Sequence, residues 1–533
     1  MRFSTDSLPG RPGGPADCAR AGRDRTRSST IPRRSAPFLS VLVAAAAVVG
    51  CSGAPEHTQP EEQPAPETEV AELAIAGLGG DRGVAAALFP IAREGDTATL
   101  TFDLTANGSE RVDTATAFGA TASPPLRPPE AIRLFDAKSD LVLTAALDSE
   151  GAPVSNEGWR YADPDGRRVQ IAFAAPSSDS VAVMLPGAAM TAEVPVIDAE
   201  APEAPGYDAL GAVAEDVYAP ADIAEAPAFA VGTYTTELDG AVALLDDTEH
   251  VEVTLDTDIL FDFGSAEIRE GSQPALDRAA QIIDARAAGP VQVTGHTDDI
   301  GSHATNQELS EDRASAVVTA LAPRLANDQE LIAEGRSFRE PVADNDTDAG
   351  RAQNRRVTIA IEEPSGQAVR AQEEGELPEF DAGPVASGSE GVSLGDFTVT
   401  APRAYELGDY LVVELEVTSH AADGAHQGRM FSGAWSHRGS GARYPSGAVS
   451  GVAVVAGTTK TYPADYLYGS TDTSTELWGT VSDLSRDAQL FEGQSQTASI
   501  VYAGVEDVTE VTVQLDHNLG NAPFRLTGIP VER

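Results

Sequence analysis

The run Thr294–Asp298, read together with Arg313, constrains this chain more than any other part of it. Val291–Thr294 alternates apolar and polar residues as a strand does, and Asn306–Leu325 has the apolar spacing of a helix. Asp298 therefore lies in a loop after a strand, and Arg313 lies about two turns into the next helix. Open α/β sheets commonly bind ligands at that edge. The sequence predicts a carboxylate and a guanidinium that face one cleft.

Strand and helix signals alternate around this unit in the order β-α-β-α-β-β. The second helix is expected to turn four residues inward, namely Leu309, Ala316, Val317 and Leu321. The pattern as a whole predicts a central α/β domain. Its expected elements are a strand over 251–263, a helix over 274–287, a strand over 291–294, a helix over 306–325, and strands over 331–333 and 356–362.

Two further motifs bracket this domain, Ile259–Ala266 at its entry and Gly350–Val357 at its exit. With the element order, they resemble the C-terminal domain of the OmpA-like family over Val251–Ile361, which implies that the sheet is mixed. The resemblance implies non-covalent binding of peptidoglycan through the diaminopimelate of the stem peptide. It implies that Asp298 takes the ammonium and that Arg313 grips the carboxylate, which suits the two-pronged geometry of a guanidinium.

The same resemblance extends the candidate site to three more residues, Thr297, Asn306 and Arg355. The alternative for Arg355 is structural packing or pairing at the start of the last strand. Asn306 matches the family's asparagine before the second helix and is expected to order the loop. Position 305 is Thr where the family usually has Tyr, and Asp312 stands where a basic residue is frequent. The alternative for the central pair is a structural ion bridge between Asp298 and Arg313.

Metal and catalytic chemistry find little support. His296 is expected to fix the strand end rather than contact a ligand. Asp344–Gly350 looks like the start of a calcium loop, but Ala349 and Arg355 stand where an EF-hand needs Gly and Glu. No HExxH, P-loop or Gly-x-Ser-x-Gly motif is evident. We therefore expect no metal, no cofactor and no enzyme activity.

The segments on either side have short alternating runs separated by Gly, Pro, Asn and Asp clusters, which is typical of all-β folds. We expect two immunoglobulin-like sandwiches, at 72–197 and 392–533. Acid-rich segments at 198–233 and 364–391 are expected to be linkers that flank the α/β domain at 234–363.

The N-terminal 50 residues are expected to be a signal peptide, because Arg33 and Arg34 precede the apolar run Ala36–Gly50. Small residues directly before Cys51 resemble the lipobox of bacterial lipoproteins, which implies a lipid on Cys51 and a disordered tether over 51–71. An ordinary secretory signal is the alternative.

The formal net charge of −47 argues against nucleic acid or anionic lipid as partners held by charge. The leading hypothesis is a non-catalytic, lipid-anchored protein of the cell envelope that contacts the wall from outside the cytoplasm. The membrane is the outer one in a two-membrane cell, and the outer face of the plasma membrane otherwise. The alternatives are a wall-targeted hydrolase, or an adhesin whose sandwiches bind protein partners.

Overall fold

A computed structural model describes residues 64–533 except 77, 79–82, 119–130, 209, 215–222, 248–249, 327–328, 363, 365–376, 428–429, 432–441, 444–448, 471–474, 483–488, 506–507 and 517–521. The expected signal peptide, Cys51 and most of the expected tether lie outside the described residues. Glu62–Arg533 forms one compact unit. Within the described ranges, none of the helices combines the length and the apolar character needed to cross a membrane.

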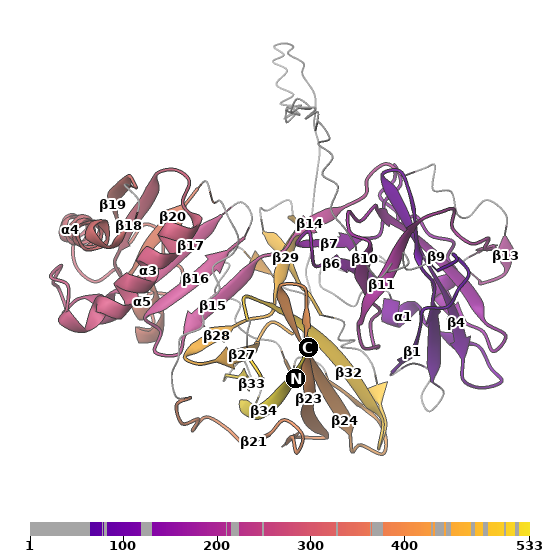
Figure 1. The fold of residues 1–533 in the computed structure, drawn as a ribbon. Helices are drawn as coiled ribbons and strands as arrows, with labels where there is room; N and C mark the ends of the chain where they lie inside the picture. Colours follow the sequence, from indigo (N-terminus) through magenta and orange to yellow (C-terminus); the bar gives the residue numbers. More distant parts are fainter. Residues whose placement is uncertain are drawn as a thin grey trace, which may run out of the picture. The chain divides into compact units, whose positions relative to one another are not determined.

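The central α/β domain carries helices on a mixed sheet (Figure 1). The strand order is β19-β18-β20-β17-β16-β15; β18 and β19 are parallel, and β20 is antiparallel to both β17 and β18. The strands are β15 (Thr233–Glu237), β16 (Val242–Asp246), β17 (Val251–Asp256), β18 (Val291–His296), β19 (Leu331–Ser337) and β20 (Arg356–Ile361). The helices are α2 (Thr257–Leu260), α3 (Gln273–Arg286), α4 (His303–Leu321) and α5 (Asp348–Asn354), with short 3-10 helices η3 (Glu270–Ser272) and η4 (Ala322–Arg324).

Element boundaries differ from the expectation at two places that matter for the site. The first strand ends at Asp256 instead of Phe263, because the Asp256 carboxylate accepts the Asp258 N–H at 2.7 Å and starts α2. Helix α4 begins earlier than expected, because Ser302 Oγ accepts the Thr305 N–H at 3.1 Å. Both caps lie in the loops that lead to the candidate site. The short helix α5 was not expected.

The inward face of α4 is also shifted from the expected one. Val317 and Leu321 are buried as expected, but Ser310 and Ala314 take the places expected for Leu309 and Ala316, which are only half-buried. Two glycines explain the shift. A Cβ on Gly295 would lie 2.1 Å from the Ser310 carbonyl oxygen, and one on Gly335 would lie 2.5 Å from Ser310 Oγ. Glycine in β18 and β19 therefore lets the Ser310 face approach closely. Asn306 and Arg313 lie on this same buried face.

The N-terminal β region has its own apolar core around Phe102, Trp159 and Phe173. The segment expected to be a linker, 198–233, carries short strands here, and Asn156 Nδ2 donates to the Pro205 carbonyl at 2.9 Å. The strands are β1 (Ala71–Ile75), β2 (Val84–Leu88), β3 (Ile91–Glu94), β4 (Thr97–Ala106), β5 (Val112–Asp113), β6 (Arg133–Asp136), β7 (Leu141–Thr144), β8 (Tyr161–Ala162), β9 (Arg167–Ala174), β10 (Ser180–Met184), β11 (Thr191–Asp198), β12 (Gly206–Tyr207), β13 (Val213–Ala214) and β14 (Ala228–Ala230), with α1 (Ala115–Phe118) and η1 (Gly158–Arg160).

The C-terminal β region packs around a second apolar core that includes Leu411, Ile500 and Phe524. Its strand β28 pairs antiparallel with β15, which extends the sheet of the α/β domain. The strands are β21 (Val385–Ser387), β22 (Val392–Leu394), β23 (Phe397–Leu407), β24 (Tyr410–Ser419), β25 (Ala425–His426), β26 (Ala442–Arg443), β27 (Val452–Ala456), β28 (Thr459–Thr461), β29 (Asp465–Ser470), β30 (Glu476–Thr480), β31 (Gln489–Leu490), β32 (Ser495–Ala503), β33 (Glu510–Leu515) and β34 (Phe524–Glu532).

Candidate ligand-binding site at the edge of the central sheet

Asp298 lies in the loop that leaves the carboxyl end of β18, and it is largely buried. Its Oδ1 accepts the Ile300 N–H at 3.1 Å, which bends the loop back on itself. Asn306, in the first turns of α4, donates from Nδ2 to the Asp298 carbonyl at 3.3 Å and to the Ile300 carbonyl at 3.1 Å. The backbone around the carboxylate is thus fixed by a side chain of the following helix, which is the loop-ordering geometry expected of Asn306.

Arg313 reaches the same part of the domain from α4, and only 3% of the residue is exposed. Its Nε donates to the Ser265 carbonyl at 3.0 Å, and its guanidinium carbon lies 5.3 Å from the centre of the Phe261 ring. Among the described residues it forms no ion pair, and its two terminal nitrogens make no hydrogen bond. Burial lowers the pKa of Arg313, while Asp258 and Asp298 act to raise it. The site therefore contains a buried cation that none of the described carboxylates contacts.

Asp298 pairs with Arg355 instead of Arg313. Arg355 Nη1 donates to Asp298 Oδ2 at 2.9 Å, across 57 residues of sequence. The structure therefore does not contain the alternative arrangement, an ion bridge between Asp298 and Arg313. The structure does bring Asp298, Asn306, Arg313 and Arg355 to one end of the sheet.

Asp258 belongs to this charged cluster, and the sequence reasoning missed it. Arg355 donates to both of its oxygens, from Nε at 2.9 Å and from Nη2 at 2.5 Å. These bonds from Arg355 lower the pKa of Asp258 and raise that of Arg355. Asp258 and Arg355 are 97 residues apart, each within or beside one of the two bracketing motifs. Nothing in a single sequence indicates that the two side chains meet.

Thr297 and His296 form the buried floor of the strand end. The Thr297 N–H donates to the Ser337 carbonyl at 2.9 Å, and the Thr297 hydroxyl is buried without a hydrogen-bond partner in the described structure. His296 Nε2 lies 3.3 Å from Thr358 Oγ1. Burial, with Arg356 and Arg336 nearby, lowers the pKa of His296 to about 3. A neutral, buried imidazole on β18 agrees with the structural role expected of it.

The segment that resembled a calcium loop instead starts α5. Asn354 Oδ1 accepts the N–H groups of Val342 and Ala343 at 2.8 and 3.0 Å, and Thr347 Oγ1 caps the helix by accepting the Gly350 N–H at 3.0 Å. Over the part of the chain that the structure describes, no group of His, Cys, Asp and Glu side chains is arranged to hold a metal ion.

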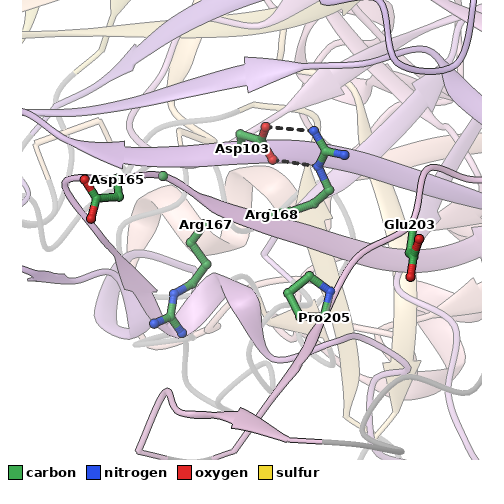
Figure 2. A pocket seen from close by; sticks show the side chains of 7 residues that line it. Asp103, Asp165, Arg167, Arg168, Glu203 and Pro205 are labelled. Atoms are coloured by element: carbon green, nitrogen blue, oxygen red, sulfur yellow. Dashed lines mark hydrogen bonds and ion pairs between the residues drawn. The ribbon is translucent and has the colours of Figure 1, made fainter.

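A second charged hollow lies in the N-terminal β region, with a volume of about 290 Å³ (Figure 2). Arg168 donates to both oxygens of Asp103, at 2.9 and 3.0 Å. Arg167 donates from Nη2 to Asp163 Oδ2 at 2.6 Å. Both arginines are thus paired inside the protein. The lining residues are Asp103, Asp165, Gly166, Arg167, Arg168, Glu203 and Pro205.

The fold and the first of these two sites define a class: an α/β domain with a mixed sheet, whose charged residues meet beyond the carboxyl end of a strand. Residues 260–355 match the model of the OmpA family. The chain thus contains an OmpA family domain within a multidomain protein that is otherwise rich in β structure.

A stretch of about a fifth of this chain is similar to curated relatives. It is 39% identical over 117 residues to photosystem I P700 chlorophyll a apoprotein A2 of Gloeobacter violaceus, and covers 21% of this chain and 13% of that protein. It is 33% identical over 110 residues to outer-membrane lipoprotein YfiB of Pseudomonas aeruginosa, and covers 21% of this chain and 66% of that protein. The chain thus spans less than two thirds of either relative. Proteins with very different names share this domain, so their overall roles do not transfer with it.

One solved structure similar to this chain is that of the cell wall anchor of the T6SS from Pseudomonas aeruginosa. It is 38% identical, covers 23% of this chain and 88% of that one, and has a TM-score of 0.22.

Proposed function

We propose that this protein is a non-catalytic protein of the cell envelope whose OmpA family domain binds peptidoglycan through the diaminopimelate of the stem peptide. The observation that carries the proposal is Arg313. A buried guanidinium that has no carboxylate partner among the described residues is costly in an unliganded protein. An anionic ligand that supplies the partner explains why the fold retains it.

The charges of the site suit a zwitterion. Asp258 and Asp298 balance Arg313 and Arg355, so these four side chains have no net charge. In the proposed complex, the terminal nitrogens of Arg313 donate two parallel hydrogen bonds to the ligand's carboxylate. Asp298 accepts from the ligand's ammonium through the lone pairs that Ile300 and Arg355 leave free. The free end of a diaminopimelate side chain carries both groups on one carbon, which matches a site with both charges in one small domain.

The proposal extends to a membrane anchor. We propose that residues 1–50 are a signal peptide, that Cys51 carries lipid, and that 51–71 is the tether. A relative of the domain that is itself called an outer-membrane lipoprotein supports this arrangement. Lipid at one end and wall binding at the other would hold membrane and wall together by effective concentration, even if each contact were weak. The protein would then act outside the cytoplasm.

For the flanking β regions, 72–197 and 392–533, we keep the proposal of immunoglobulin-like sandwiches joined to the 234–363 domain through 198–233 and 364–391. Their mostly antiparallel strand pairs, and the apolar core that each region contains, support it.

The test is sedimentation of the full chain with insoluble peptidoglycan that contains diaminopimelate. Wild type should sediment with the wall, while Asp298→Asn and Arg313→Gln should stay in the supernatant. The matched control is Arg324→Gln, since Arg324 lies just beyond α4 and pairs with Asp277 at the surface. It should sediment like wild type. Soluble muropeptides should not be released. Sedimentation of Arg313→Gln at the wild-type level would refute the proposal.

A further inference from the structure

Arg355 divides its hydrogen bonds unequally between two carboxylates. Its Nε and Nη2 donate to both oxygens of Asp258, whereas only Nη1 reaches Asp298. The Nε–Nη2 edge of the guanidinium, which can form two-pronged bonds, is thus occupied by Asp258. Asp298 receives a single bond from a group that could otherwise clasp it with two.

This division matters for any ligand that brings a cation to Asp298. One oxygen of Asp298 already accepts the Ile300 N–H, and the other accepts Arg355. A carboxylate has about four acceptor positions, so room remains for an ammonium. A second bond from Arg355 would fill part of that room and neutralise the carboxylate more fully.

We propose that Asp258 is a positioning residue for ligand binding, because it holds Arg355 away from a two-pronged clasp of Asp298 and so keeps the ammonium position open. This inference rests on the proposed function. It adds Asp258, which does not touch the ligand, to the residues that affect binding. It also makes Arg355 a competitor of the ligand's ammonium for Asp298.

The place of Asp258 depends on the backbone more than on its ion pair. Thr257 donates to the Arg355 carbonyl from its N–H at 3.3 Å and from Oγ1 at 2.9 Å, which ties the start of α2 to the start of β20. Asp256 caps α2 from the other side. The Asp258 side chain is half exposed. Asp258→Asn should therefore leave the fold intact and remove only the charge that holds Arg355.

The experiment is calorimetric titration of the full chain with the tripeptide L-alanyl-D-glutamyl-meso-diaminopimelate. Asp258→Asn should bind about tenfold more weakly than wild type, the scale of one hydrogen bond to a charged group. With Arg355→Met as the background, the same Asp258→Asn change should have no effect, since the competitor is gone. Asp262→Asn is the control, because Asp262 is a well-exposed carboxylate in the next loop. It should bind like wild type.

The outcomes separate the two proposals. If wild type does not bind the tripeptide, the proposed function fails. If wild type binds and Arg313→Gln does not, but Asp258→Asn binds like wild type, only the role of Asp258 is overturned. That role is also overturned if Asp258→Asn weakens binding equally with and without Arg355, since the effect would then be structural.

Discussion

Two arginines in different regions of the molecule are equally buried and differently paired. Arg167, in the N-terminal β region, and Arg313, in the OmpA family domain, are each 3% exposed. Each lies over an aromatic ring, Arg167 at 4.2 Å from the centre of Tyr207 and Arg313 at 5.3 Å from that of Phe261. Arg167 has a carboxylate partner in Asp163, and Arg313 forms no ion pair within the described residues.

Under the proposed function, the difference separates a structural charge from one that is kept for a ligand. A buried ion pair largely meets its desolvation cost inside the protein, so Arg167 needs no ligand. Arg313 has a similar desolvation cost, but in the described structure it gains only a hydrogen bond to a carbonyl and a contact with an aromatic ring. Arrangements that reduce stability, such as an unpaired buried charge, are expected mainly at functional sites. The N-terminal hollow in Figure 2 is therefore the weaker candidate for a ligand site, although it is lined by several charged residues.

The most severe test of this contrast is Arg313→Met. We expect affinity for the diaminopimelate tripeptide to fall at least about 100-fold, because two hydrogen bonds to a charged group are lost. The stability of the domain should stay the same or rise, since an apolar side chain in place of an unpaired buried charge is often neutral or stabilising. Calorimetric titration and hydrogen exchange of the β18 amides measure the two effects. A loss of more than about 2 kcal/mol of stability would mean that Arg313 is structural.

The opposite pattern is expected for Arg167→Met. Removing this arginine leaves Asp163 with Arg111 alone, at 2.6 Å, and should cost the N-terminal β region about 2 kcal/mol. Affinity for the tripeptide should not change. Hydrogen exchange of the β9 amides reports the stability, and titration reports the affinity. If affinity fell with stability, the two regions would not be independent.

The sequence predicted the scaffold of the site better than its contacts. Alternation and helical spacing placed Asp298 after a strand and Arg313 on the next helix, because both signals are local. The bonds of Arg355 to Asp298 and Asp258 span 57 and 97 residues, and periodicity carries no information about such pairs. The prediction of which residues of α4 face inward was partly wrong for a related reason. Its rotation depends on Gly295 and Gly335 in neighbouring strands, and not on the apolar residues of the helix alone.

A third prediction concerns the buried floor of the site. The pKa of His296 falls from 6.5 to about 3 on folding, so the folded state holds fewer protons than the unfolded state between these values. Stability should therefore decrease as pH falls from about 6 to about 4, by up to about 1.4 kcal/mol per pH unit. His296→Gln should remove this slope. Hydrogen exchange of the β18 amides, corrected for intrinsic rates, compares the variants at the two pH values. An unchanged slope would show that other groups cause it.

The smallest expected effect is on stability at acid pH, and it comes from the ion pair between Asp258 and Arg355. It tests the same contrast between paired and unpaired charges. Arg355 depresses the pKa of Asp258 below its ordinary value of 3.8, so this pair stabilises the fold above that value, and its contribution is lost as pH falls through the folded pKa. The Asp258 side chain is half exposed, so solvent screening should limit the contribution to less than about 1 kcal/mol. Arg355→Gln should flatten the acid limb of stability below about pH 4, measured by exchange at β20. Arg313→Gln should flatten that limb less, because Arg313 contacts neither carboxylate and lowers the pKa of Asp258 only through its charge. If the two variants flattened it equally, the claim that one arginine is paired and the other is held for a ligand would fail.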